Sequence, residues 1–288
     1  MSAPVLETHE AQPTGWLGMT RAGAAVAWVE YKALRVYPSN LWLAIAQELT
    51  VVGVWYFVAQ FLTPVANGVV HGSYVAYVLV GVLLNQVALA ALRSPFTTIS
   101  EAFWDKRLET YRLAVSGIWA NLIGRLAWQV LFSTVLQGLV AAALVATGLV
   151  ALGHTVAWPD AALIWFLLVS ANAGLGLVGA SLFFLLEVKN GQDPVTWVYQ
   201  YLVQIVSGLY VPLAVLPVWL RAFGQALPQT YAFSAMRLLV LSGAGPHAVT
   251  GALAGLAVGA VAALALGLTM MRWALVRAER LSGLGVVV

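Results

Sequence analysis

Two charged residues lie within apolar segments of the sequence, and they are the first candidates for chemistry. Glu48 and Arg125 each lie about seven residues inside the end of such a segment. Because an unpaired charge in hydrocarbon costs a few kcal/mol, opposite charges at matching depth predict an ion pair. We favour a role in bracing the helix bundle over direct contact with a substrate. Snorkelling of both side chains to the membrane interface is the other structural alternative.

Glycine motifs bear on nucleotide binding. The phosphate-loop pattern G-x-x-x-x-G-K-[ST] is absent from the sequence, so this chain is not expected to bind and hydrolyse ATP by that route. A G-x-G-x-x-G pattern is present at Gly174, Gly176 and Gly179, but it lies in the middle of an apolar run and follows no strand. The four-residue spacing of Asn172, Gly176 and Ala180 instead predicts close packing between helices.

Metal and enzyme chemistry have little support in the sequence. Cysteine is absent, and the four histidines have neither paired spacing nor a carboxylate cluster beside them: His9, His71, His154 and His247. No Ser/His/Asp set and no pair of carboxylates lies within an apolar segment. We therefore expect no metal site, no cofactor bound by this chain and no enzymatic activity.

The elements that position these residues follow from the composition. Of the 288 residues, 61% are hydrophobic and only 9% are charged, whereas a soluble domain carries about 25% charged residues. So few charges cannot cover the surface of a soluble globule. A soluble enzyme, a nucleic-acid-binding protein and a disordered protein are therefore excluded, and the sequence predicts an all-α integral membrane protein.

Six uncharged segments are long enough to cross a membrane as helices, which requires about 20 apolar residues. They are residues 49–70, 72–92, 126–153, 161–186, 194–220 and 248–271. An even number of spans places both termini on the same side. Lys and Arg residues fall almost entirely on that side, so the positive-inside rule predicts that both termini are cytoplasmic. We expect a multi-pass protein in the plasma membrane of a prokaryote.

The regions outside the spans divide the chain further. Residues 1–18 are expected to form a flexible cytoplasmic N-terminus. Residues 19–37 predict an amphipathic helix in the membrane interface, with Arg21, Lys32 and Arg35 on its polar side; an ordinary cytosolic helix is the alternative. Residues 38–277 form the six-span domain, and residues 278–288 form a cytoplasmic tail.

The longest cytoplasmic loop, residues 94–116, mixes charged and aromatic side chains. Ser100 followed by Glu101 favours a short helix within it. Exposed aromatic residues beside mixed charge are typical of a contact surface, whereas a solvated loop that only fixes topology is the alternative. The candidate contact residues are Glu101, Phe103, Trp104, Asp105, Arg107 and Glu109.

A proline-rich segment precedes the last span. Residues 195–241 contain only two charged side chains, Arg221 and Arg237, and are interrupted by Pro212, Pro217 and Pro228. The segment is too long for one helix and too interrupted for two complete ones. We expect a re-entrant hairpin at about residues 207–241, which dips into the outer leaflet and returns.

This arrangement resembles that of the ABC-2 type transporter permeases. The family pattern before the last span is a Gly, a following Pro, a Leu-Pro pair, and a Pro-x-Thr/Ser-aromatic stretch with a trailing Arg. The residues that carry the resemblance are Ser207-Gly208-Leu209-Tyr210-Val211-Pro212, Leu216-Pro217, Leu227-Pro228-Gln229-Thr230-Tyr231 and Arg237. The cytoplasmic loop departs from the family, which commonly carries Gly-Thr-x-Glu before an apolar-Pro pair at this place.

The resemblance implies the permease subunit of an ATP-driven exporter. Such a subunit pairs with a second permease subunit, as a homodimer or a heterodimer, and docks two copies of a separate ATPase that binds ATP and Mg. The substrates implied are amphipathic or hydrophobic: a drug, an antibiotic, a lipid or a lipid-linked glycan. Coupling to the ATPase would pass through the charged helix around residues 101–109.

The resemblance also implies a substrate path along the dimer axis, lined by aromatic and amide side chains of the first, second and fifth spans. A lipid-facing position is the alternative for each of the candidates, which are Trp55, Tyr56, Tyr199, Tyr201, Gln204 and Tyr210. The alternative function is that of a carrier driven by an ion gradient. Carriers usually need a titratable residue at membrane depth, and Glu48 is the one that this sequence offers.

Overall fold

The computed structural model describes residues 16–66, 73–106, 117–153, 155–185 and 193–282 of the chain. Within these ranges it contains nine α-helices and two 3₁₀-helices and no strand. Five of the helices are long and apolar enough to cross a membrane. They are α2 (Pro38–Ala66), α3 (Tyr74–Trp104), α5 (Gly117–Ala146), α6 (Trp158–Leu185) and α10 (Thr250–Ser282). The protein is therefore an all-α, multi-pass membrane protein, as its composition predicts.

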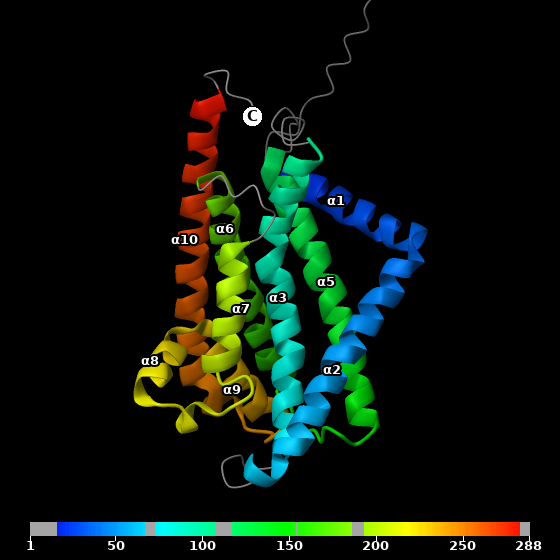
Figure 1. Cartoon of the computed structure of the whole chain (residues 1–288), viewed down its shortest axis with the longest axis vertical. Helices are drawn as coiled ribbons and strands as arrows, with labels where there is room; N and C mark the ends of the chain where they lie inside the picture. The colour runs from blue at the N-terminus through cyan, green and yellow to red at the C-terminus, as the bar shows by residue number, and fades with distance from the viewer. Residues whose placement is uncertain (1–15, 67–72, 107–116, 154, 186–192, 283–288) are drawn as a thin grey trace, which may run out of the picture.

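Helix α3 forms the centre of the bundle. Helices α2, α5 and α6 pack against it, and 78% of its most apolar stretch is buried, compared with 11% for α2 and 22% for α5. Ser73 caps its N-terminus by accepting a hydrogen bond from the backbone N–H of Ala76 at 3.3 Å. In Figure 1 α3 extends along the bundle from one end to the other. It is the element against which most other helices are positioned.

Glycine residues bring α6 into backbone contact with its two neighbours. A Cβ atom at Gly174 would collide with the backbone of Ala263 in α10, and one at Gly176 would collide with the carbonyl of Leu92 in α3. Only the absence of a side chain permits approaches this close. The predicted packing role of the G-x-G-x-x-G pattern is confirmed. Its last member, Gly179, faces the carboxylate of Asp193, which caps the following helix.

In place of a sixth long span, the structure has a broken segment. Helix α7 (Pro194–Val206) has 13 residues, too few to cross a membrane. Gly208 follows it with a φ of +78°, a left-handed conformation that favours glycine and ends the helix. The chain continues through a 3₁₀ turn (Leu213–Val215) and two short helices, α8 (Val218–Ala226) and α9 (Pro228–Val240). A second 3₁₀ turn (Pro246–Val249) leads into α10.

The predicted prolines lie at the starts of these short elements. Pro212 precedes the first 3₁₀ turn, Pro217 is the N-cap residue of α8, and Pro228 is the first residue of α9. Proline suits these positions because the first N–H groups of a helix have no partner within it. The expected interruption between the fourth long span and α10 is therefore present, and α8 and α9 lie together towards one end of the bundle (Figure 1).

Helix α1 (Trp16–Val36) matches the helix expected at residues 19–37 and begins three residues earlier, so Trp16 to Gly18 belong to it and not to a tail. It packs against α5 at the end of the bundle opposite to α8 and α9 (Figure 1). The C-terminal end of α10 lies at this same end. Helix α1 and the C-terminal end of α10 therefore lie at the same end of the molecule.

Helix α3 continues well past the point at which a loop was expected. Its last three turns contain Ser94, Phe96 and Ile99, all of which are buried, and it ends at Trp104. The charged loop expected at residues 94–116 therefore does not begin at residue 94: residues 94–104 are the end of α3, and they take the place of the separate short helix expected there. Residues 107–116, which include Arg107 and Glu109, lie outside the described residues.

Candidate functional site

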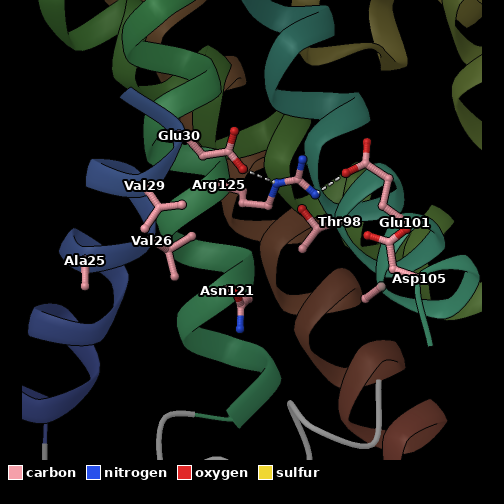
Figure 2. A pocket seen from close by; sticks show the side chains of 10 residues that line it. Ala25, Val26, Val29, Glu30, Thr98, Glu101, Asp105, Asn121 and Arg125 are labelled. Atoms are coloured by element: carbon pink, nitrogen blue, oxygen red, sulfur yellow. Dashed lines mark ion pairs between the residues drawn. The ribbon is translucent and has the colours of Figure 1, made fainter. Parts of the chain in front are cut away.

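An ionic cluster joins three helices at the end of the bundle where α1 lies. Arg125, in the third turn of α5, bonds through Nε to Oε1 of Glu30 in α1 at 3.0 Å and through Nη1 to Oε2 of Glu101 in α3 at 2.5 Å. Figure 2 shows the guanidinium group between the two carboxylates. The Arg125 and Glu30 side chains are only 21% and 29% exposed. One partly buried cation therefore links α1 and the end of α3 to α5.

Close packing of α1 on α5 brings Glu30 within reach of Arg125. A Cβ atom at Gly124 would collide with the carbonyl of Gly23 and with the side chain of Val26, so glycine permits the contact. Glu30 follows Val26 by one helical turn and therefore faces the same neighbour. Glu30 was not among the residues predicted from the sequence to form a site. A usable signal existed, because it is the one acid in a segment whose other charges, Arg21, Lys32 and Arg35, are basic.

A cavity of about 350 Å³ surrounds this cluster. Besides the ionic residues, its lining includes Val26, Thr98, Asp105 and Asn121 from the same three helices (Figure 2). Three carboxylates, those of Glu30, Glu101 and Asp105, share the lining with one guanidinium group, so the cavity is acidic overall. No described group of three His, Cys, Asp or Glu side chains has an arrangement that could hold a metal ion. The carboxylates of the cavity can accept hydrogen bonds from basic groups.

The predicted pairing of Glu48 with Arg125 is not present. Glu48, in α2, is 5% exposed and accepts a hydrogen bond from Nε2 of Gln86 in α3 at 3.2 Å. Arg125 is engaged by Glu30 and Glu101 instead. A position along a helix, which the sequence gives, does not determine which face of the helix a residue occupies. The expected bracing role applies to Arg125 with different partners.

Among the described members of the predicted coupling surface, some side chains face outward or line the ionic cavity, and one packs into the bundle. Trp104 is 57% exposed at the end of α3, and Glu101 faces the ionic cavity. Asp105 is the C-cap residue of α3, and its backbone N–H donates to the Glu101 carbonyl at 2.8 Å. Phe103, expected to be exposed, packs against Phe183 of α6 with ring centroids 5.3 Å apart. Phe103 therefore connects the end of α3 to the bundle core.

The candidate substrate-path residues do not form one surface. Trp55 of α2 stacks on Tyr210, which follows the break after α7, with ring centroids 3.6 Å apart. Tyr56 and Tyr199 pack at the edge of the main hydrophobic core. Tyr201 is 49% exposed and contacts Trp197 on the outer face of α7. The sixth candidate is the half-buried Gln204.

Arg237, in α9, fastens the break after α7. Its Nε donates to the carbonyl of Tyr77 at 2.9 Å, Nη1 to Gly208 at 2.8 Å, and Nη2 to Leu209 at 2.7 Å. Its guanidinium carbon lies 3.5 Å from the ring centroid of Tyr77. The side chain is 7% exposed and forms no ion pair within the described residues. Its donors bind the carbonyls that the interrupted helix leaves without partners.

Two tyrosines of α3 and one amide complete the anchoring of this segment. Tyr77 donates to the carbonyl of Gly208 at 2.9 Å, and Tyr74 donates to that of Tyr210 at 3.0 Å. At the start of α9, Nε2 of Gln229 donates to Oδ1 of Asn172 in α6 at 2.7 Å. These contacts join residues far apart in the sequence, and nothing in the local pattern identified them. They hold the broken segment against α3 and α6.

Comparison with known protein families finds no family model that matches the chain, and comparison with curated proteins finds no matching sequence. The geometry and composition together therefore identify an all-helical, multi-pass membrane protein with five candidate spans.

Proposed function

We propose that the chain is the membrane-spanning permease subunit of an ATP-driven exporter. It pairs with a second permease subunit, identical or related, and two copies of a separate ATPase bind ATP and Mg and supply the energy. Its substrate is amphipathic or hydrophobic, of the drug, antibiotic, lipid or lipid-linked glycan class. Helix α7, with the re-entrant hairpin of α8 and α9, takes the place of the sixth crossing.

The observation that carries this proposal is the organisation of the end of α3. An exposed aromatic side chain, Trp104, lies beside an acidic cavity in which Arg125 joins three helices. Large aromatic residues supply most of the binding energy at interfaces, and charges around them set the register of the partner. A partner that pushes on this end therefore contacts α1, α3 and α5 together.

Movement can pass from this surface into the bundle by two routes. Phe103 contacts Phe183, so displacement of the end of α3 reaches α6 and, through the contact at Gly174, α10. Arg125 transmits the same displacement to α5 and α1. In the proposed cycle, closure of the ATPase pair moves this end, and the permease dimer opens on the opposite side.

The coupling test compares two exposed tryptophans at opposite ends of the molecule. Trp104 is 57% exposed at the end of α3, and Trp158 is 63% exposed at the start of α6 (Figure 1). The chain is co-expressed with the candidate ATPase subunit of its source organism and purified in mild detergent. Trp104→Ala should lower ATPase association by roughly thirtyfold, since an interface anchor contributes about 2 kcal/mol. Trp158→Ala should leave association unchanged. Equal association of both variants would exclude the end of α3 as the docking surface, and absence of an associated ATPase in the wild type would exclude the proposed class.

The proposed orientation is tested by cysteine labelling of this cysteine-free chain. Trp219 of α8 is 63% exposed and lies at the end of the bundle opposite to Trp104 (Figure 1). In intact cells, a membrane-impermeant maleimide should react with the Trp219→Cys variant and not with Trp104→Cys. Permeabilised cells should label both. Reaction of Trp104→Cys alone in intact cells would invert the topology and place the docking surface on the wrong side for an ATPase.

A carrier driven by an ion gradient is the second candidate function, and Glu48 specifically favours it. The carboxylate is buried at membrane depth, has a neutral partner, Gln86, and is not engaged by Arg125. Reconstituted vesicles separate the two functions. Export by this chain with its ATPase should require ATP and persist without an ion gradient, whereas transport by the chain alone under a proton or sodium gradient would establish the carrier.

A further inference from the structure

A second cavity, of about 280 Å³, lies between α2, α3 and α5. Helices α2 and α5 each pack on α3, and the groove between them is lined by side chains from all three. Four glutamines line it: Gln47 of α2, Gln86 of α3, and Gln129 and Gln137 of α5. Primary amides are uncommon in membrane-spanning helices, because leaving them unpaired in hydrocarbon is unfavourable. Their convergence on one groove marks it as a polar compartment within the membrane-spanning part of the protein.

The polar side chains of the groove do little to satisfy one another. Among the described residues, the bond from Gln86 to Glu48 is the only hydrogen bond between two of its side chains. Seven buried side-chain atoms of the described chain have no hydrogen-bond partner, and three of them belong to this lining: Oε1 of Glu48, Oγ of Ser94 and Oε1 of Gln137. All three side chains are more than nine-tenths buried. The hydrogen-bonding capacity of these three oxygens is therefore unused among the described residues, which is uncommon for buried polar groups.

The charges around the groove favour a cation. Glu48 is the one acid in the lining, and Arg93 is the one base. Arg93 donates to Oε1 of Gln200 in α7 and forms no ion pair with Glu48. It follows Gln86, the partner of Glu48, by seven residues, which is about 10 Å along α3. Because Coulomb energy falls with distance, a cation bound about 4 Å from Glu48 is attracted more than twice as strongly as Arg93 repels it.

We propose that this groove binds a protonated primary amine with an apolar body, with Glu48 as its counter-ion. An ammonium group has three N–H donors and no acceptor, which complements the carboxylate of Glu48, whose Oε1 has no hydrogen-bond partner among the described residues. Phe132, Leu89 and Leu136 provide apolar surface for the rest of the molecule. A divalent metal ion would need several charged oxygen ligands, and the groove has a single carboxylate. As a statement about the transported molecule, this inference rests on the proposed function; as a binding site it does not.

The test measures binding to the purified full-length chain in detergent, with benzylamine as the probe at pH 7, where it is protonated. Isothermal titration should detect binding of benzylamine and at least tenfold weaker binding of benzyl alcohol, which has the same ring and no charge. Glu48→Gln, which keeps the shape and the contact with Gln86, should also weaken benzylamine binding at least tenfold. Gln137→Met, which removes an amide from the lining and keeps its volume, should weaken binding less than Glu48→Gln does. The control Asp160→Asn removes a carboxylate from the first turn of α6, outside the groove, and should bind as the wild type does.

Two results would overturn the assignment. If the wild type does not bind benzylamine, the groove is not a site for protonated amines. If benzylamine and benzyl alcohol bind equally, or Glu48→Gln binds as the wild type does, the groove recognises only the apolar ring. Neither result affects the proposed ATPase partnership, which the Trp104 comparison tests separately. Amine binding by a chain that associates with no ATPase would preserve the site and remove the exporter proposal.

Discussion

Replacing Arg237 with glutamine should destabilise the protein, and the size of the effect can be worked out from its contacts. Loss of the guanidinium group leaves the Leu209 carbonyl without any donor among the described residues, at a cost of about 1–3 kcal/mol. The Gly208 carbonyl keeps the Tyr77 hydroxyl, and the Tyr77 carbonyl keeps its place in α3, so each loses one bond of about 0.5–1 kcal/mol. The cation–π contact with Tyr77 adds about 1 kcal/mol.

One contribution to the free energy of unfolding favours the Arg237→Gln variant. Arg237 is a buried cation without an acidic partner among the described residues, so a neutral side chain removes a desolvation penalty. A net loss of about 3 kcal/mol remains, which corresponds to a decrease of roughly 6–9 °C in the unfolding temperature of a chain of this size. Arg237→Lys should lose most of the same stability, because an ammonium group lacks the planar guanidinium fork that reaches three carbonyls.

The assay is thermal unfolding in detergent, followed by intrinsic tryptophan fluorescence. Arg272→Gln, an exposed arginine of α10, is the matched control and should change the unfolding temperature by no more than 1–2 °C, since surface substitutions stay within about 0.5 kcal/mol. If Arg237→Gln is as stable as Arg272→Gln, the guanidinium group does not hold the break after α7. A stable Arg237→Lys with an unstable Arg237→Gln would show that charge, and not the fork, is required.

An independent change tests the same contact from the side of α3. A Cβ atom at Gly81 would collide with Nη2 of Arg237 and lie 2.9 Å from Cδ1 of Leu209. Gly81→Ala must therefore displace the Arg237 side chain and should lower the stability of the protein. Gly53 of α2 has no heavy atom within 4 Å of such a Cβ atom. Gly53→Ala should therefore be neutral or stabilising by up to about 1 kcal/mol, as expected within a helix. Equal stability of the two variants would contradict the close approach at Gly81.

Two further outcomes are expected from the packing and the ionic cluster. Gly174→Ala should lower the unfolding temperature by several degrees, because it separates the backbones of α6 and α10. The control Gly138→Ala, in α5, has open space around its Cβ position and should not lower the unfolding temperature. Similar unfolding temperatures for both variants would contradict the backbone contact. In double-mutant cycles with glutamine substitutions, Arg125 and Glu30 should show a coupling of about 0.5–1 kcal/mol in thermal unfolding, while Arg125 and Glu48 should be additive. If Arg125 were coupled to Glu48 and not to Glu30, the ion pair of Arg125 with Glu30 would be contradicted.

The sequence predicted well those features that depend on local composition. Long apolar runs identify α2, α3, α5, α6 and α10, because length and hydropathy alone decide whether a helix can cross a membrane. The packing role of Gly174 and Gly176 was also predictable, since small residues at helical spacing have few other uses within an apolar helix.

Features that depend on which side of a helix faces a neighbour were not predictable. Glu48 and Arg125 have opposite charges and similar depth, yet they face different partners. Phe103 directly precedes the exposed Trp104, and only its contact with Phe183 shows that it packs against the core. Residues 194–220 contain no charged residue, so the sequence predicted a full span there. In the structure the helix ends after Val206, and Gly208 has a left-handed backbone conformation.

The length and placement of α3 have a mechanical consequence. Its 31 residues correspond to about 46 Å of helix. One end carries Trp104, and the other carries Tyr74 and Tyr77, which hold the segment after α7. Between them, near Pro95, the helix lacks one backbone hydrogen bond and touches the backbone of α6 at Gly176. About 14 Å of helix separates that point from Trp104, and about 32 Å separates it from Tyr74. Under the proposed coupling, a rigid tilt of α3 by about 10° at that point would move the Tyr74 end by about 5 Å, more than twice as far as the Trp104 end.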